Sequence, residues 1–204
     1  MGMSDVIAVT ITADTLAADD DGISASAQVA NNAALVIGGA LASGGSVTLS
    51  NARKLTITSG GNDSGISFTI VGTDINGTAQ TESLTGANAG VATSAAFFLT
   101  IASITAVGDP AGTVKAGISG DSSDIVFAGR SRLKGAYLTS TATAGTVDFL
   151  NTSTAGTSLL KISSVASATA TRDVVIPENG VLFTDGIYLQ YTVSTFLTLT
   201  VFHA

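Results

Sequence analysis

Cysteine and tryptophan are absent from this chain of 204 residues, histidine occurs once, proline occurs twice, and only 11% of the residues are charged. Without cysteine there is no disulfide framework, no thiolate nucleophile and no thiolate metal ligand. Enzymes usually gather several His, Cys, Asp, Glu or Lys side chains at one site, and the few present here are scattered along the sequence. The composition therefore favours a protein that is not an enzyme, with no cofactor and no metal, whose function depends on assembly.

Acidic residues outnumber basic ones by fifteen to eight, which gives a net charge of −7. Direct binding of nucleic acid requires clustered Lys and Arg side chains. The basic cluster that the sequence offers consists of Arg130, Arg132 and Lys134. Alternate positions of a strand share one face, so these three side chains are predicted to lie together. We interpret them as a solvated or subunit-facing strand edge and expect no nucleic-acid partner.

Long apolar runs are also missing, although the mean hydropathy is high at +0.48. No stretch approaches the roughly 18 to 20 apolar residues of a membrane-spanning helix. Residues 1–5 lack the basic region and apolar core of a signal peptide. We therefore expect a protein made in a cytoplasm, with no membrane partner, whose excess of apolar residues lies at contacts with other subunits.

What the chain has in abundance is alternation of apolar residues with Ser and Thr, at the period of two that is typical of half-buried strands. The alternation is clearest in residues 55–58, 66–70, 146–149, 187–193 and 197–201. Between two such segments, Asp74-Ile75-Asn76-Gly77 has the Asn-Gly pair that tight hairpins favour. These patterns predict an all-β protein.

A change of composition divides the chain. Residues 119–126 are rich in Ser, Gly and Asp and are predicted to be a linker. The flanking segments, 21–118 and 127–204, are predicted to form two small antiparallel β-sandwich or jelly-roll-like units. Residues 1–20 are predicted to be an N-terminal arm that pairs with a neighbouring subunit. The arm's candidate interface residues are Val6, Ile7, Val9 and Ile11.

Three other groups of residues invite a functional interpretation. The spacing of Asp74, Asn76, Gly77 and Glu82 does not match a calcium loop, and a hairpin turn is favoured there. The carboxylates of residues 19–21 are expected to point to opposite sides of an extended chain, which favours a solvated acidic turn over a cation site. The single histidine, His203, is interpreted as part of a closing strand and not as a member of a catalytic triad.

Two parts of the sequence resemble modules of tailed-bacteriophage virion proteins. The first resemblance covers residues 55–90, with LTITSGGNDSGISFTI at 55–70, GTDING at 72–77 and ESLTGANAG at 82–90. The second covers RLKG at 132–135, IPENGVLF at 176–183 and GIYL at 186–189. The resemblance implies a structural protein of the virion, of the head decoration (cement) type, without catalytic residues.

The expected function follows from the composition and this resemblance together. We expect a decoration protein that binds the major capsid protein across capsomer junctions on the surface of an icosahedral phage head, as a homo-oligomer with a trimer favoured. The alternative is a tail or fibre component that contacts the host surface. The number of copies per particle distinguishes the two, because a decoration protein should be about as abundant as the shell protein.

Overall fold

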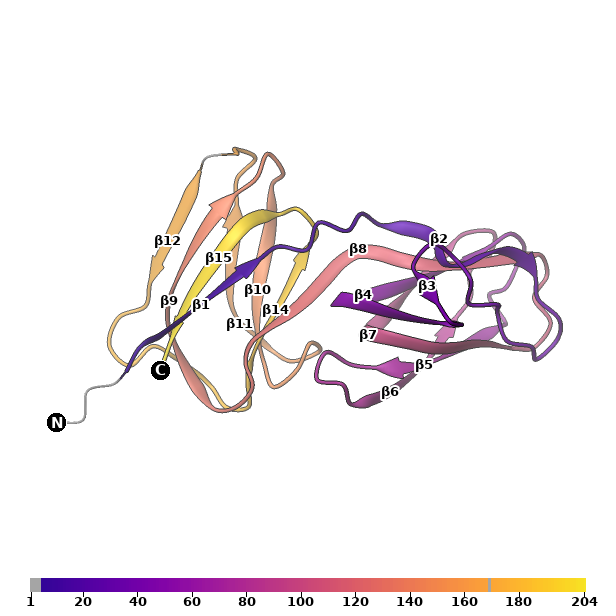
Figure 1. Cartoon of the computed structure of the whole chain (residues 1–204), viewed down its shortest axis with the longest axis horizontal. Helices are drawn as coiled ribbons and strands as arrows, with labels where there is room; N and C mark the ends of the chain where they lie inside the picture. Colours follow the sequence, from indigo (N-terminus) through magenta and orange to yellow (C-terminus); the bar gives the residue numbers. More distant parts are fainter. Residues whose placement is uncertain (1–4, 169) are drawn as a thin grey trace. The chain divides into compact units, whose positions relative to one another are not determined.

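The computed structural model describes residues 5–168 and 170–204 and shows an all-β protein with no helix among them (Figure 1). By its internal contacts the chain divides into two units. We call residues 17–120 the continuous unit. The split unit combines residues up to Leu16 with residues 121–204. Within the described residues there is no helix of the length and apolarity needed to cross a bilayer.

The split unit is a β-sandwich. One layer is a five-stranded antiparallel sheet with the order β1-β15-β9-β12, in which β13 also pairs with β9. These strands are β1 (Ile7–Thr12), β9 (Ser131–Ser140), β12 (Thr171–Val175), β13 (Val181–Phe183) and β15 (Phe196–His203). The facing layer contains β10 (Gly145–Asn151), β11 (Ser158–Ser164), β14 (Ile187–Thr192) and the end of β8 (Thr113–Phe127).

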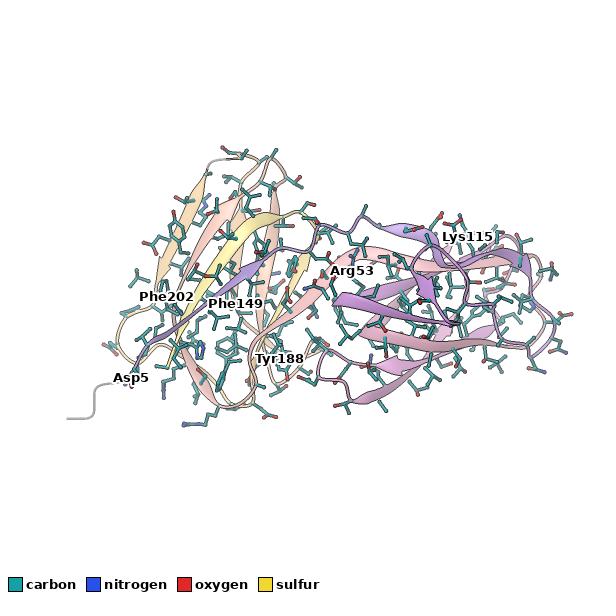
Figure 2. The ribbon with its side chains drawn as sticks, in the orientation of Figure 1. Asp5, Arg53, Lys115, Phe149, Tyr188 and Phe202 are labelled. Atoms are coloured by element: carbon teal, nitrogen blue, oxygen red, sulfur yellow. The ribbon has the colours of Figure 1, made fainter. Side chains whose placement is uncertain are left out.

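Alternate residues of both layers fill the core of the sandwich. Leu138 on β9, Phe149 on β10, Leu189 on β14 and Val201 on β15 are fully buried (Phe149 is labelled in Figure 2). Their neighbours along each strand point outward, as the period of two requires. The apolar half of the alternating sequence is therefore the core of the sandwich.

The continuous unit is built on a sheet with the order β8-β4-β7-β5-β6, to which β2 and β3 add. Its strands, besides the first part of β8, are β2 (Asp19–Gln28), β3 (Ala42–Ser43), β4 (Ser46–Ser59), β5 (Ser67–Thr73), β6 (Ala79–Thr85) and β7 (Val91–Val107). Strand β7 is long enough to pair with β4 through its first part and with β5 through its last part. Phe68, Ile70 and Ile104 are among the fully buried residues of its core.

The predicted strands and hairpin are confirmed. Residues 55–58, 66–70, 146–149, 187–193 and 197–201 lie almost entirely within β4, β5, β10, β14 and β15. The turn between β5 and β6 is closed by Asp74, whose Oδ1 accepts hydrogen bonds from the N–H groups of Asn76 and Thr78, both at 2.8 Å. Gly77 has a φ of 77°, as an Asn-Gly turn requires.

The predicted linker needs correction, because residues 119–126 belong to strand β8. The two units do divide between Gly120 and Asp121, but the chain continues there as a strand. Ser122 and Ser123 are fully buried, and the Ser123 hydroxyl donates to the carbonyl of Leu189 at 2.6 Å. Small polar residues therefore serve close packing in this segment, not flexibility.

The predicted N-terminal arm is also corrected for the residues that the structure describes. Ile7–Thr12 form β1, which pairs with β15 of the same chain and brings Val9 opposite Val201. Val9 and Ile11 pack against the core of the split unit. Residues 1–4 of the predicted arm lie outside the described residues.

Candidate interaction surfaces

The outer face of β5, β6 and β7 in the continuous unit carries no charge. Residues alternate with buried Phe68 and Ile70 on β5, so the intervening side chains point outward. Cross-strand pairing aligns them in four rows of three positions. We call this surface the hydroxyl face. Its positions are Ser67, Thr69, Val71, Thr73, Ala79, Thr81, Ser83, Thr85, Thr100, Ser103, Thr105 and Val107.

The hydroxyl face lacks the usual protection against association. Exposed strand positions of soluble proteins commonly carry Lys or Glu, which oppose unwanted contacts with other sheets. Here Ser and Thr replace them, and two of the hydroxyls, those of Thr73 and Thr100, bond to each other at 2.7 Å. Strands lie about 4.8 Å apart, and alternate residues along a strand lie about 6.7 Å apart. Three strands with four outward positions each therefore cover about 400 Å².

The charged residue of β6 is turned away from this face. The Glu82 carboxylate accepts hydrogen bonds from the N–H groups of Ala95 at 2.8 Å and Ala96 at 3.0 Å on β7. Gln80, two residues earlier, donates to the carbonyl of Phe97 at 2.8 Å. These side chains satisfy backbone groups of β7. Glu82 therefore has a structural role that the sequence did not reveal.

The outer face of the five-stranded sheet in the split unit is similar but less uniform. Cross-strand pairs align Thr10 with Thr200, and Thr200 with Tyr137, whose exposed fraction is 41%. The next row includes Phe202, which pairs with Gly135 (Phe202 is labelled in Figure 2). Asp173, opposite Tyr137, adds one carboxylate. This face thus combines hydroxyls with an exposed aromatic ring.

Two of the three candidate basic residues, Arg132 and Lys134, have partners within their own unit. Arg132 and Lys134 lie on β9, as predicted, and Arg130 lies just before this strand. The Arg132 guanidinium donates to the carbonyl of Asn179 at 3.3 Å, and the Lys134 ammonium donates to that of Glu178 at 3.2 Å. They hold the turn before β13.

Of the candidate arm residues, Val6 and Ile7 remain half exposed, at 53% and 51%.

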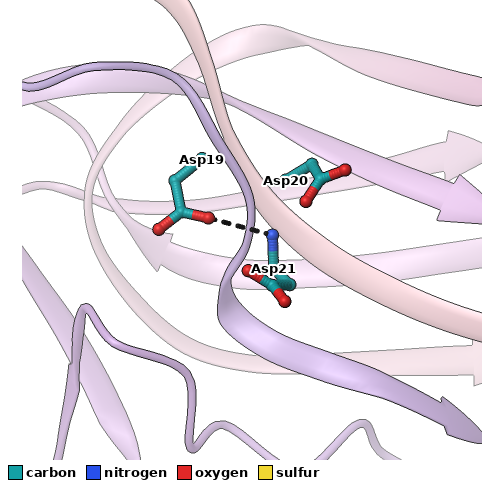
Figure 3. Close-up of side chains that lie close together, drawn as sticks. All are labelled: Asp19, Asp20 and Asp21. Atoms are coloured by element: carbon teal, nitrogen blue, oxygen red, sulfur yellow. Dashed lines mark hydrogen bonds between the residues drawn. The ribbon is translucent and has the colours of Figure 1, made fainter.

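The three consecutive aspartates come together, contrary to the expectation that their carboxylates diverge. One carboxylate oxygen from each of Asp19, Asp20 and Asp21 lies within 4.8 Å of the others (Figure 3). The pairing of β2 with β8 is irregular between Asp19 and Ser24, so the period of two does not hold there. Lys115 on β8 forms an ion pair with Asp20, and this hydrogen bond raises the pKa of Lys115. We interpret the cluster as a clamp between β2 and β8.

His203 forms a buried pair with Ser131. The Ser131 hydroxyl lies 2.9 Å from His203 Nδ1, and both residues are buried. The other ring nitrogen, Nε2, has no hydrogen-bond partner among the described residues, and the ring packs against Phe127 at 4.9 Å between centroids. A nucleophilic serine must reach its substrate, whereas Ser131 is only 4% exposed. The pair is consistent with the predicted role of His203 in a closing strand.

Burial makes the split unit sensitive to acid through His203. Loss of hydration lowers the pKa of His203 below its ordinary value of 6.5. Its contribution to stability is therefore fully present above about pH 6.5 and is lost as the pH falls toward the lowered folded-state pKa. We expect the urea midpoint to decrease over this range in the wild type and to decrease less in His203→Gln. His203 is the only histidine, so equal decreases in both proteins would contradict this assignment.

A buried polar network near the start of the split unit escaped sequence analysis. The Tyr191 hydroxyl donates to the Asp124 carboxylate at 2.6 Å and accepts the N–H of Asp14 at 3.1 Å. Ser122 donates to the Asp14 carboxylate at 3.1 Å. Burial and the bond to Asp124 raise the pKa of Tyr191. The network ties residues far apart in the sequence, so no local signal marks it.

Comparisons with known proteins identify no relative. No protein-family model, no curated protein and no solved structure matches the chain. Interpretation of its surfaces therefore rests on their own chemistry.

Proposed function

We propose that this protein decorates the head of a tailed bacteriophage, where it binds the major capsid protein across capsomer junctions as a trimer. The observation that carries the proposal is the charge-free hydroxyl face. Such a face suits burial against another protein, because no charged side chain has to lose its hydration there. Strands β5 and β6 of this face also lie within residues 55–90, the segment that resembles phage virion modules.

The size of the face supports attachment through several copies. A stable interface buries about 800 Å² on each partner, about twice the area of about 400 Å² that strand spacing gives for this face. One copy would accordingly bind weakly. Three linked copies would bind much more tightly, because the second and third contacts form at high effective concentration. A trimeric decoration protein fits this requirement.

Copy number tests the location. The measurement is quantitative mass spectrometry of purified particles of the phage that encodes the protein. A head decoration protein should be present in about as many copies as the shell protein. A count in the tens would instead indicate the tail or fibre alternative, and absence from the particles would overturn both.

A substitution in the hydroxyl face tests the contact. Thr69 lies in the middle of the face, between Ser83 and Thr105. Thr69→Lys places a charge where burial is expected, and we expect at least about a tenfold weaker attachment, equivalent to about 1.4 kcal/mol. The measurement is the number of copies that sediment with particles lacking the wild-type protein.

The matched control is Thr143→Lys, because Thr143 is exposed in the turn between β9 and β10. This control should leave attachment unchanged. Wild-type attachment should also survive about 1 M salt, where charges are screened within about 3 Å. Release of the wild type by salt, or equal attachment of both variants, would contradict the proposed contact.

A further inference from the structure

A groove opens between two consecutive strands of the split unit, β11 and β12. The two strands belong to different layers of the sandwich and are joined by residues 165–170, of which 169 lies outside the described residues. The groove has a volume of about 380 Å³. Its lining consists of Leu160, Lys161, Ile162 and Ser163 on β11 and Arg172, Asp173 and Val174 on β12.

Both strands that border the groove have a free edge. β11 pairs with β10 alone and β12 pairs with β9 alone, so each is the last strand of its layer in the described structure. The edge of a sheet presents backbone N–H and C=O groups that can pair with a further strand. β11, with seven residues, offers the longer edge.

The floor of the groove is apolar. Leu160 and Ile162 are opposite buried Phe149 and Val147 on the neighbouring strand β10. Their side chains therefore point toward the interior of the sandwich. Val174 on β12 does the same, opposite buried Ala136. Ile162 belongs to the buried core, and Leu160 and Val174 are partly buried and pack against it. Alternate apolar side chains of an added strand would extend this core.

One cation faces the groove without a partner. Arg172 is opposite buried Leu138 on the neighbouring strand β9, which places the Arg172 side chain on the inner side of the sheet. Arg172 is nevertheless exposed. It forms no ion pair with any residue that the structure describes. Lys161, on the outer side, is already paired with Asp148 at 3.2 Å. Arg172 is thus the group available to an anion in the groove.

We propose that this groove binds an extended strand of another protein, which pairs with the free edge of β11. Side chains on one side of the bound strand are apolar and pack on Leu160, Ile162 and Val174, and one of them is replaced by a carboxylate that meets Arg172. Backbone hydrogen bonds supply affinity in this mode of recognition, and the alternate side chains supply specificity.

A second copy of this chain is a poor occupant. β11 contains no carboxylate and carries Lys161. Pairing of β11 with β11 of another copy would therefore bring no anion to Arg172 and would add positive charge beside it. Like charges at such short range oppose association. The charge pattern favours an acidic, apolar strand from a different protein.

Short synthetic peptides test the proposal on the full chain. The probe is a peptide in which Thr alternates with Val and one central Val is replaced by Glu; a second peptide carries Lys at that place. Binding is followed by amide chemical shifts in NMR spectra of the labelled protein. We expect the Glu peptide to perturb β11 and to bind at least about tenfold more tightly than the Lys peptide, a difference of about 1.4 kcal/mol.

Charge reversal makes the test specific. Arg172→Glu should reverse the preference of the two peptides, and Arg172→Lys should retain it. Arg130→Glu is the matched control, because Arg130 is exposed outside the groove, and it should leave the preference for the Glu peptide unchanged. N-methylation of the Glu peptide should abolish binding, because it removes the backbone donors.

Four results would overturn the proposal. The first three are the absence of peptide binding, binding without shifts in β11, and a preference that Arg172→Glu does not change. A dimer in sedimentation velocity that Arg172→Glu alters would assign the groove to a second copy and would also overturn it. Because neither peptide depends on phage particles, these outcomes are independent of the proposed decoration function.

Discussion

Substitution of Gly72 by alanine is expected to destabilise the continuous unit by at least about 3 kcal/mol. A Cβ atom at Gly72 would lie 1.9 Å from the carbonyl oxygen of Thr100 and 3.2 Å from Cδ1 of Phe98. The carbonyl belongs to the backbone of β7, which pairs with β5 at this point. Relief of the clash would thus require the two central strands to separate locally. The measurement is urea unfolding followed by circular dichroism.

Gly65→Ala is the matched control for this prediction. Gly65 precedes β5, and a Cβ atom there would have no neighbour within 4 Å. Alanine also reduces the entropy of the unfolded chain, so this variant should be as stable as the wild type or more stable by up to about 1 kcal/mol. Similar losses in Gly65→Ala and Gly72→Ala would show that close approach of the β7 backbone is not the reason for glycine at position 72.

Removal of the Phe149 ring is expected to have an effect of similar size in the split unit. Phe149 on β10 is fully buried in the sandwich core. Phe149→Ala should cost about 3 to 5 kcal/mol, because it removes apolar contacts and leaves a cavity. At about 4 to 8 °C for each kcal/mol in a unit of this size, the melting temperature should fall by more than about 10 °C. Differential scanning calorimetry provides the measurement.

Phe202→Ala also removes a phenyl ring, but from the outer face of the five-stranded sheet, the other layer of the sandwich. Phe202 is only half-buried, against Gly135. Its loss should cost less than half as much as that of Phe149, since less area returns to water. Equal costs would mean that the outer face of the five-stranded sheet is buried in solution, which would point to an interface there.

The sequence was sufficient for local structure and insufficient for pairing. Alternation in residues 197–201 predicts a strand because the polarity of each side chain indicates whether it faces the core or the solvent. Nothing local indicates that β15 pairs with β1, or that buried Ser122 and Ser123 belong to a strand. β1 and β15 are far apart in the sequence, and the buried Ser122 and Ser123 donate hydrogen bonds to residues that are equally distant, Asp14 and Leu189. Composition suggested a linker because small polar residues are common both in flexible segments and in tightly packed ones.

The surfaces illustrate the same limit. Outward Ser and Thr residues are visible in the alternation of residues 66–70, but a face exists only once the register of three strands is known. The groove beside Arg172 was not predicted for a related reason. It requires that consecutive strands β11 and β12 belong to different layers, which the sequence pattern does not state. Arg172 itself is an ordinary exposed cation until its neighbours are placed.

The pairing of β1 with β15 has a consequence for the order of folding during synthesis. Ile7 is opposite His203, so β1 pairs with a strand that is synthesised long after it. Residues 17–120 can form their own core while β1 still lacks a partner. Contacts between such distant residues carry a large loop-closure cost and form slowly. The nascent chain therefore exposes an unpaired apolar strand until β15 has been synthesised, which makes this interval the one in which aggregation or chaperone binding is expected.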